Sequence, residues 1–281
     1  MGSVSISILF GLLSALTYGA ADFTGGLIAK RTSSLGIVIL GHIGSLLLLA
    51  LFALLLGETL PPGRDLLFAI LAGVAGGIGL ILLYRSLAEG QMSLASPVSA
   101  LVAASIPVMV GLWTQGLPEI TMLIGFALAL IAIWLIAQNG RISLVNILAQ
   151  IRLPFISGIF FGLFFVGMAQ GGTHAVIWPV VATRIGSIPS LLLYSFMTHQ
   201  RWLPGRKHWG SIGLISLLDT AGNLFYILAS RVGRLDLAAL ISSLYPGSTV
   251  ALARIILKEK ISPLQVVGIL CALIALVFIS L

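Results

Sequence analysis

The chain has 281 residues, of which 59% are hydrophobic and only 8% are charged, and its mean hydropathy is +1.15. Soluble domains carry about 25% charged residues, so this composition excludes an ordinary soluble domain and predicts an all-α integral membrane protein. The net charge of +7 comes from Lys and Arg at the ends of apolar segments, without interleaved aromatic residues. We therefore expect membrane lipid, and no nucleic acid, among the partners.

Ten apolar segments follow one another along the chain. Each has about 20 residues, which at 1.5 Å per residue spans the roughly 30 Å hydrocarbon core of a bilayer. Short connectors predict that successive helices are antiparallel neighbours. The first segment lacks a basic leader and is too long for a signal peptide, so we expect it to remain in the mature protein. The predicted helices are residues 5–28, 34–56, 66–88, 93–115, 119–138, 153–173, 177–198, 209–230, 235–257 and 262–281.

An internal repeat relates the two halves of the sequence. A shift of 142 residues places the tetrapeptide HIGS, which begins at His42, on RIGS, which begins at Arg184. A shift of 143 aligns LIGFALALIAIWLI with VVGILCALIALVFI. The halves are residues 1–140 and 141–281, each with five predicted helices. Because five is odd, the second half must enter the membrane in the opposite orientation, which predicts two inverted five-helix repeats.

Two stretches carry a family resemblance: YGAADFTGGLIAKR near the start and SLYPGSTVALARIILKEKISPLQVVG near the end. The most specific residues are Asp22-Phe23 in the first stretch and Tyr245-Pro246, Glu259 and Gln265 in the second. Both stretches resemble the EamA branch of the drug/metabolite transporter superfamily. The resemblance implies ten helices in two five-helix repeats and a transport function. The first half departs from the pattern, since Ala104 aligns with Pro246.

Asp22 is the first candidate for a binding site. Ionisable residues within the membrane cost a few kcal/mol or more unless they face a partner or a wet cavity, so each is a functional candidate. Asp22 lies about 9 to 12 Å along its helix from Lys30 and Arg31, and Tyr18 lies one turn earlier on the same face. The alternative is a carboxylate that snorkels to the membrane surface.

Two further groups of polar residues are candidates in the second half. Asp219, Asn223 and Tyr226 are spaced four and three residues apart, so they share one helical face that should line a cavity. Arg184 and its repeat counterpart His42 form the other group. Arg184 is expected to bind a substrate carboxylate or to pair with Asp22 or Asp219. Its position near the start of a segment leaves open a second interpretation, an anchor at the membrane surface.

Other features set limits on the chemistry. The motifs HExxH, GxxxxGK[ST] and CxxC are absent, the four histidines are scattered, and Cys271 is the single cysteine. No metal site, cofactor or ATP-driven pump is therefore expected. Five prolines, at positions 97, 107, 179, 189 and 246, lie in or beside predicted helices and favour kinks there.

The function that fits these features is secondary transport of small polar metabolites, amino acids or drugs by alternating access. We expect it in the cell membrane, with proton coupling through Asp22 or Asp219, no enzymatic activity, and a monomer sufficient for function. A passive channel or lipid flippase, and a membrane-embedded enzyme, are the alternatives. They differ in that a channel or flippase should show no counterflow and an enzyme must form a product.

Orientation is a separate prediction. Eleven Lys and Arg follow the odd-numbered segments, whereas four, at positions 64, 184, 231 and 234, lie on the other side. The positive-inside rule then places both termini outside the cell. The family resemblance implies the reverse, with both termini in the cytoplasm.

Overall fold

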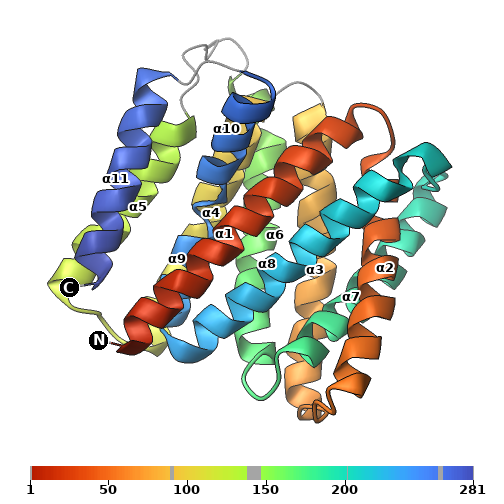
Figure 1. Cartoon of the computed structure of the whole chain (residues 1–281), viewed down its shortest axis with the longest axis horizontal. Coiled ribbons are helices and arrows are strands. Elements are labelled where there is room, and N and C mark those ends of the chain that lie inside the picture. The colour runs from red at the N-terminus through yellow and green to blue at the C-terminus, as the bar shows by residue number, and fades with distance from the viewer. Residues whose placement is uncertain (1, 89–91, 138–146, 201, 259–261, 281) are drawn as a thin grey trace.

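The computed structural model describes residues 2–88, 92–137, 147–200, 202–258 and 262–280, so the predicted role of Glu259 lies outside the described residues. The regular elements in these ranges are helices (Figure 1). Most of their bounds fall within a few residues of the predicted segments, but the sixth helix begins at Ile147 rather than at residue 153. They are α1 (Gly2–Ala29), α2 (Ser34–Leu55), α3 (Gly63–Ala88), α4 (Met92–Thr114), α5 (Ile120–Ala137), α6 (Ile147–Gly171), α7 (Ile177–Thr198), the 3-10 turn η1 (Arg206–His208), α8 (Trp209–Val232), α9 (Leu235–Ser242), α10 (Tyr245–Ile256) and α11 (Pro263–Ser280).

In the described ranges, seven stretches are long and apolar enough to cross a membrane. They correspond to α1, α2, α3, α6, α7, α8 together with η1, and the α9–α10 pair. Shorter apolar stretches lie within α4, α5 and α11, at Val98–Thr114, Ile120–Leu135 and Pro263–Ala272.

The predicted ninth helix is wrong as a single element, because residues 235–257 form two helices. α9 ends at Ser242, and α10 begins at Tyr245. Pro246 follows the break directly; it has no N–H to donate to the carbonyl of Ser242, so a continuous helix would lose a hydrogen bond there. The kink expected at Pro246 is therefore present, whereas α4 and α7 continue past their own prolines.

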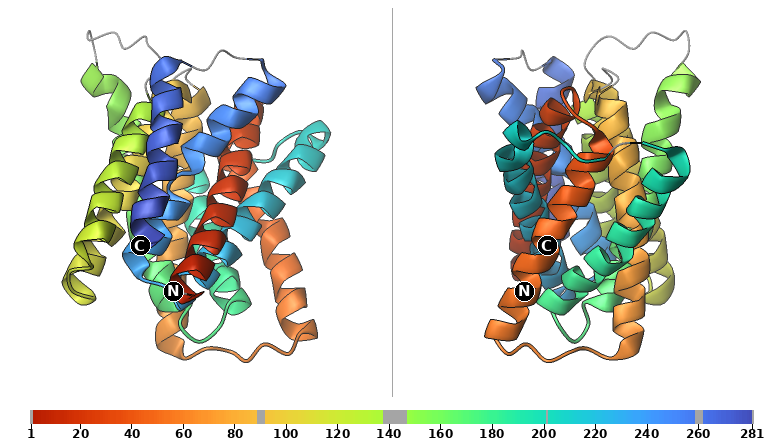
Figure 2. Two further views of the ribbon diagram at one scale, coloured as in Figure 1. Left: turned by 60° about the vertical axis from the view of Figure 1, so that its left-hand side comes forward. Right: turned by 90° about the vertical axis from the view of Figure 1, so that its right-hand side faces the viewer.

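Successive helices run in opposite directions, except that α10 continues in the direction of α9, and both termini lie at the same end of the bundle (Figures 1 and 2). We call this the termini end. It also holds the loops that join α2 to α3, α4 to α5, α6 to α7 and α8 to α9. Helices from the two halves are interleaved: α1 packs on α8, α3 on α6 and α7, α2 on α7, α4 on α6 and α9, and α5 on α11.

Glycine allows α3 and α7 to pack backbone to backbone. A Cβ at Gly73 of α3 would collide with the main chain of Thr183, and one at Gly186 of α7 would collide with that of Ile70. Small residues permit such close approach within a membrane, where dispersion contacts and hydrogen bonds drive helix association. The packing brings Arg184, which follows Thr183, against the middle of α3.

Candidate functional site

A small cavity of about 50 Å³ lies among α1, α2, α3, α6, α7, α8 and α10. One part of its lining is apolar or aromatic and another part is polar. The apolar and glycine residues are Gly73, Gly76, Gly77, Leu80, Phe161, Phe164 and Phe165, and the polar ones are Tyr18, Asp22, His42, Thr183, Arg184, Asp219, Asn223 and Tyr245.

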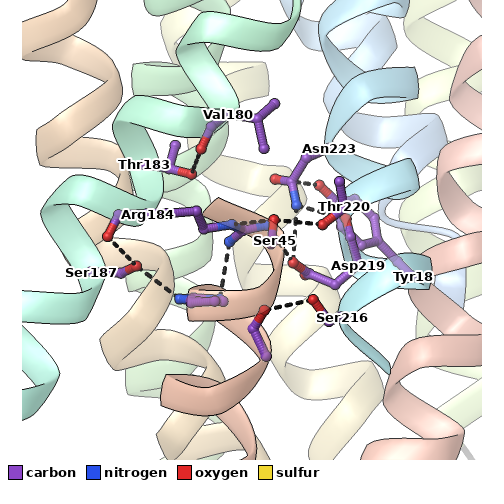
Figure 3. Close-up of polar contacts among 12 residues, drawn as sticks. Tyr18, Ser45, Val180, Thr183, Arg184, Ser187, Ser216, Asp219, Thr220 and Asn223 are labelled. Atoms are coloured by element: carbon purple, nitrogen blue, oxygen red, sulfur yellow. Dashed lines mark hydrogen bonds and ion pairs between the residues drawn. The ribbon is translucent and has the colours of Figure 1, made fainter. Parts of the chain in front are cut away.

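Arg184 is the centre of the polar wall (Figure 3). Its Nη2 donates to Oδ2 of Asp219 at 2.7 Å, its Nε to Oγ of Ser45 at 3.1 Å, and its Nη1 contacts Nε2 of His42 at 2.9 Å. The side chain of Arg184 is only 4% exposed and that of Asp219 17%. Arg184 therefore forms an internal ion pair with Asp219, one of the two pairings expected, and it is not an anchor at the membrane surface.

The contact with Arg184 fixes the tautomer of His42. A guanidinium has only donors, so Nε2 of His42 must accept, which leaves the proton on Nδ1 and the ring neutral. Nδ1 lies 2.8 Å from Oγ of Ser187, and that hydroxyl in turn donates to the carbonyl of Arg184 at 3.5 Å. The imidazole is thus held between two groups of α7.

The HIGS and RIGS tetrapeptides contact each other reciprocally. The first residues of the two tetrapeptides, His42 and Arg184, are hydrogen-bonded to each other although they lie 142 positions apart. The first residue of each tetrapeptide also contacts the fourth residue of the other. Arg184 binds Ser45, which is 139 positions away, and His42 binds Ser187, which is 145 positions away. Such i-to-j and j-to-i contacts are what a two-fold axis produces.

Asp219 continues the network toward α1. The amide nitrogen of Asn223 donates to the carbonyl of Asp219 at 2.7 Å and to its Oδ2 at 3.2 Å, and Oδ1 of Asn223 accepts from the Tyr18 hydroxyl at 3.1 Å. Thr220 lies on the other side, where its hydroxyl is 2.7 Å from that of Ser45. Hydrogen bonds thus link α7, α2, α8 and α1 around one wall of the cavity.

Asp22 lines the same cavity but stays outside this network. It is 7% exposed, and its carboxylate has no hydrogen bond or ion pair with any described residue. It lies within electrostatic range of Asp219. The carboxylate therefore does not snorkel to the membrane surface.

Tyr226 is not part of the cavity lining, although it shares a helical face with Asp219 and Asn223. Its side chain is fully buried, its ring packs against Phe165 at 4.7 Å between centroids, and its hydroxyl donates to the carbonyl of Phe165 at 2.6 Å. The prediction that all three residues face the cavity therefore fails at Tyr226, because α6 fills the space at that depth.

The sequence interpretation missed Ser45 and Ser187 as site residues, although both belong to the aligned tetrapeptides. It also missed Tyr245, which it used only for the family resemblance, and the phenylalanines of α6, which are not distinguishable from other apolar residues by type. No group of three or more His, Cys, Asp and Glu side chains is placed to hold a metal ion in the described part of the chain.

The EamA-like transporter family model matches the chain twice, over residues 5–138 and 149–281. The chain belongs to the EamA-like transporter family. It is therefore a multi-pass membrane protein of a transporter family.

Two other proteins are similar to this EamA-like chain. The uncharacterized protein MJ1333.1 of Methanocaldococcus jannaschii is 25% identical over 134 residues, which are 48% of this chain and 98% of that protein. A solved crystal structure of a protein superposes with a TM-score of 0.73 over 98% of both chains at 14% identity, so it shares the fold.

At the termini end of this EamA-like protein, Glu58 caps a helix of the other half. The α2–α3 loop places its carboxylate at the start of α7, where it accepts from the backbone N–H groups of Val176 at 2.8 Å and of Ile177 and Trp178 at 2.9 Å. The indole N–H of Trp178 donates back to the carbonyl of Glu58 at 2.8 Å. Because α7 has no cap from its own Val176, the carboxylate satisfies donors and complements the positive end of the helix dipole.

A second contact at this end joins α4 to α9. Arg234 pairs with Asp236 at 2.8 Å and donates through Nη2 to the carbonyl of Gly116 at 2.8 Å. The amide oxygen of Gln115 accepts from the backbone of Leu235 at 3.2 Å. Together with Glu58, these residues join loops of the first half to helix starts of the second, and we call the set the termini-end contacts.

Proposed function

We propose that this protein is a secondary transporter that moves a small polar metabolite, amino acid or drug across the cell membrane by alternating access. In this proposal ten transmembrane helices form two inverted five-helix repeats. The observation that carries it is the cavity whose polar wall is built from both halves: α1 and α2 supply Tyr18, Asp22 and His42, and α7 and α8 supply Arg184 and Asp219. Transporter sites commonly lie at the interface of such repeats.

The pattern of helix packing supports the inverted repeat. Exchanging the halves turns α1 into α6 and α3 into α8, so the α1–α8 and α3–α6 contacts are equivalent, whereas α2–α7 and α4–α9 each map onto themselves. The reciprocal HIGS and RIGS contacts lie where the axis would pass. A relative about half the length of this chain is a further support, because it corresponds to a single repeat.

The termini-end contacts suit the closed gate of an alternating-access cycle. Each joins the two halves at one end of the bundle, through hydrogen bonds in which Glu58 and Arg234 are half-buried. Water could replace these hydrogen bonds on opening. Rocking of one half against the other would then exchange the closed end.

Coupling is proposed to use protons carried by Asp22 or Asp219. Both carboxylates line the cavity, and they lie within electrostatic range of each other. A carboxylate paired with a guanidinium and a second, unpaired carboxylate nearby can together hold a variable number of protons as the cavity opens to either side.

Purified protein in proteoliposomes tests the proposal. We expect a panel of radiolabelled metabolites to contain at least one compound that accumulates faster with a pH gradient and shows counterflow. Uptake that follows the concentration gradient without counterflow would indicate a channel instead. Conversion of a compound to a product would indicate an enzyme.

A further inference from the structure

The charges around the cavity do not cancel. Its titratable lining includes two carboxylates, Asp22 and Asp219, one guanidinium, Arg184, and one imidazole, His42. His42 is neutral because its Nε2 accepts from Arg184. Arg184 and Asp219 compensate each other at 2.7 Å. The carboxyl group of Asp22 is left without a partner of opposite charge, so whenever it is ionised it carries the one uncompensated charge among these four groups.

A lone carboxylate at this depth is costly, because the groups around it cannot replace water well. Asp22 is more than nine-tenths buried and makes no hydrogen bond with a described residue. Three tyrosines, Tyr18, Tyr84 and Tyr245, lie within its electrostatic range. Tyr18 and Tyr245 already donate elsewhere, to Asn223 and to the carbonyl of Ser96, and the buried hydroxyl of Tyr84 makes no hydrogen bond with Asp22 or another described residue. The carboxylate therefore remains available to a bound cation.

The rest of the lining suits a cation with an apolar body. Phe161, Phe164 and Phe165 of α6 and the rings of Tyr18 and Tyr245 border the same space. Aromatic faces attract cations through their quadrupole, and they also pack well against apolar groups.

An anionic ligand fits less well. Three of the five N–H groups of Arg184 are bound to Ser45, His42 and Asp219 among the described residues, and its charge is already balanced. An added carboxylate would face two carboxylates with no free positive charge. The expectation that Arg184 recognises a substrate carboxylate is therefore disfavoured by the geometry around it.

We propose that the cavity binds a small organic amine in its cationic form, with the Asp22 carboxylate as counter-ion and the aromatic rings around its apolar body. The proposal rests on the transport function proposed above, since it names the substrate class of the same site.

Three probes of matched shape test the charge preference: phenethylamine, 2-phenylethanol and 3-phenylpropionate. Binding to the full-length protein in detergent is measured by calorimetry. We expect phenethylamine to bind at least roughly tenfold more tightly than the alcohol, and 3-phenylpropionate to bind most weakly. Equal binding of amine and alcohol would overturn the proposal and leave Asp22 as a proton site. Preference for the carboxylate, or binding of none of the three, would also overturn it.

Asp22 variants assign the preference to this carboxylate. Asp22→Asn removes the charge with little change in shape, and we expect the amine-to-alcohol ratio to fall to about one. Asp22→Glu keeps the charge and should keep most of the preference, which controls for misfolding. Glu119→Gln, at an exposed position in the α4–α5 loop, should behave as the wild type. A preference that survives in Asp22→Asn would contradict the proposal.

Binding and transport are separated by repeating the assay with proteoliposomes. Tight amine binding without uptake or counterflow would overturn the transporter and leave the amine site standing. Transport of neutral or anionic compounds without amine binding would do the reverse.

Discussion

His42 and Arg184 stand 142 positions apart in the chain, and their side chains meet at 2.9 Å in the middle of the bundle. The same offset aligns the sequences around them, so each half supplies the corresponding member of a contact between α2 and α7. The two positions correspond in the sequence repeat but differ in charge, since one member is a cation and the other accepts a hydrogen bond. The site is therefore chemically asymmetric at the point where the two aligned tetrapeptides meet.

Arg184→Lys should destabilise the protein, although the charge is kept. A lysine ammonium cannot reproduce the planar set of bonds to Ser45, His42 and Asp219. We expect a loss of about 1.5–3 kcal/mol of unfolding free energy, seen as a lower thermal midpoint in detergent. Arg206→Lys, at an exposed position near η1, is the control and should leave the midpoint unchanged. Equal thermal midpoints for both variants would mean that the planar arrangement of the Arg184 hydrogen bonds does not contribute to stability.

Asp219→Asn and Asp22→Asn should differ in stability. Removing the Asp219 charge leaves Arg184 buried without its partner, at a cost of about 3 kcal/mol, whereas Asp22 has no partner to lose. The double variant Arg184→Met with Asp219→Leu should recover much of the loss, because it removes both charges. Thermal unfolding in detergent measures all three. An Asp22→Asn variant that is destabilised as much as Asp219→Asn would contradict this assignment of partners.

Glu58→Gln should loosen the termini end. An amide keeps one acceptor for the N–H groups at the start of α7 but loses the charge that the helix dipole favours, which costs about 1 kcal/mol. We expect faster maleimide labelling of Ala175→Cys, a buried position in the α6–α7 loop, in a Cys271→Ala background. Glu119→Gln should leave the labelling rate at its starting value. No change in rate with Glu58→Gln would remove this residue from the gate.

Tyr18→Phe and Tyr226→Phe should separate binding from stability. Tyr226 donates to the carbonyl of Phe165 in the core, so its loss should cost about 1–2 kcal/mol without a change in ligand affinity. Tyr18 lines the cavity and holds Oδ1 of Asn223, so its loss should change affinity or uptake rate more than the thermal midpoint. The reverse pattern would show that the two tyrosines have been assigned the wrong way round.

Both termini should lie outside the cell if loop charge decides the orientation. Burial of Arg184 inside the bundle removes it from the count, which leaves three Lys and Arg on the poorer side against eleven on the other. A reporter that is active only in the cytoplasm, fused after Leu281, should then be silent. Strong activity would support the orientation implied by the family resemblance.

Hydropathy was enough to predict the helices to within a few residues, because lipid requires apolar runs of nearly fixed length. It could not predict the break before Pro246, since a short turn between two apolar helices leaves the hydropathy unchanged. The helical spacing of Asp219, Asn223 and Tyr226 correctly places them on one face. Spacing carries no information about neighbours, however, and Phe165 of α6 takes the space beside Tyr226.

The sequence also did not predict the contacts that distant loops make with helix starts. Glu58 lies in a connector with no pattern that marks it, and its partners are backbone groups 118 to 120 positions away. Arg184 was predicted either to pair or to anchor, because its distance from the helix start does not give its depth. Its surroundings depend on how α2 and α8 pack beside α7, because these two helices supply His42, Ser45 and Asp219.

The interruption between α9 and α10 divides one candidate membrane span into two shorter rods. Both rods pack against α1, and α9 also packs against α4. An unpaired backbone group in hydrocarbon costs several kcal/mol, so a continuous helix resists bending in lipid. Here the missing N–H of Pro246 has already been accommodated, and the turn is held by a few backbone hydrogen bonds, such as that from Gly247 to Leu244. A change of tilt between the two rods therefore meets less resistance than bending of an unbroken helix.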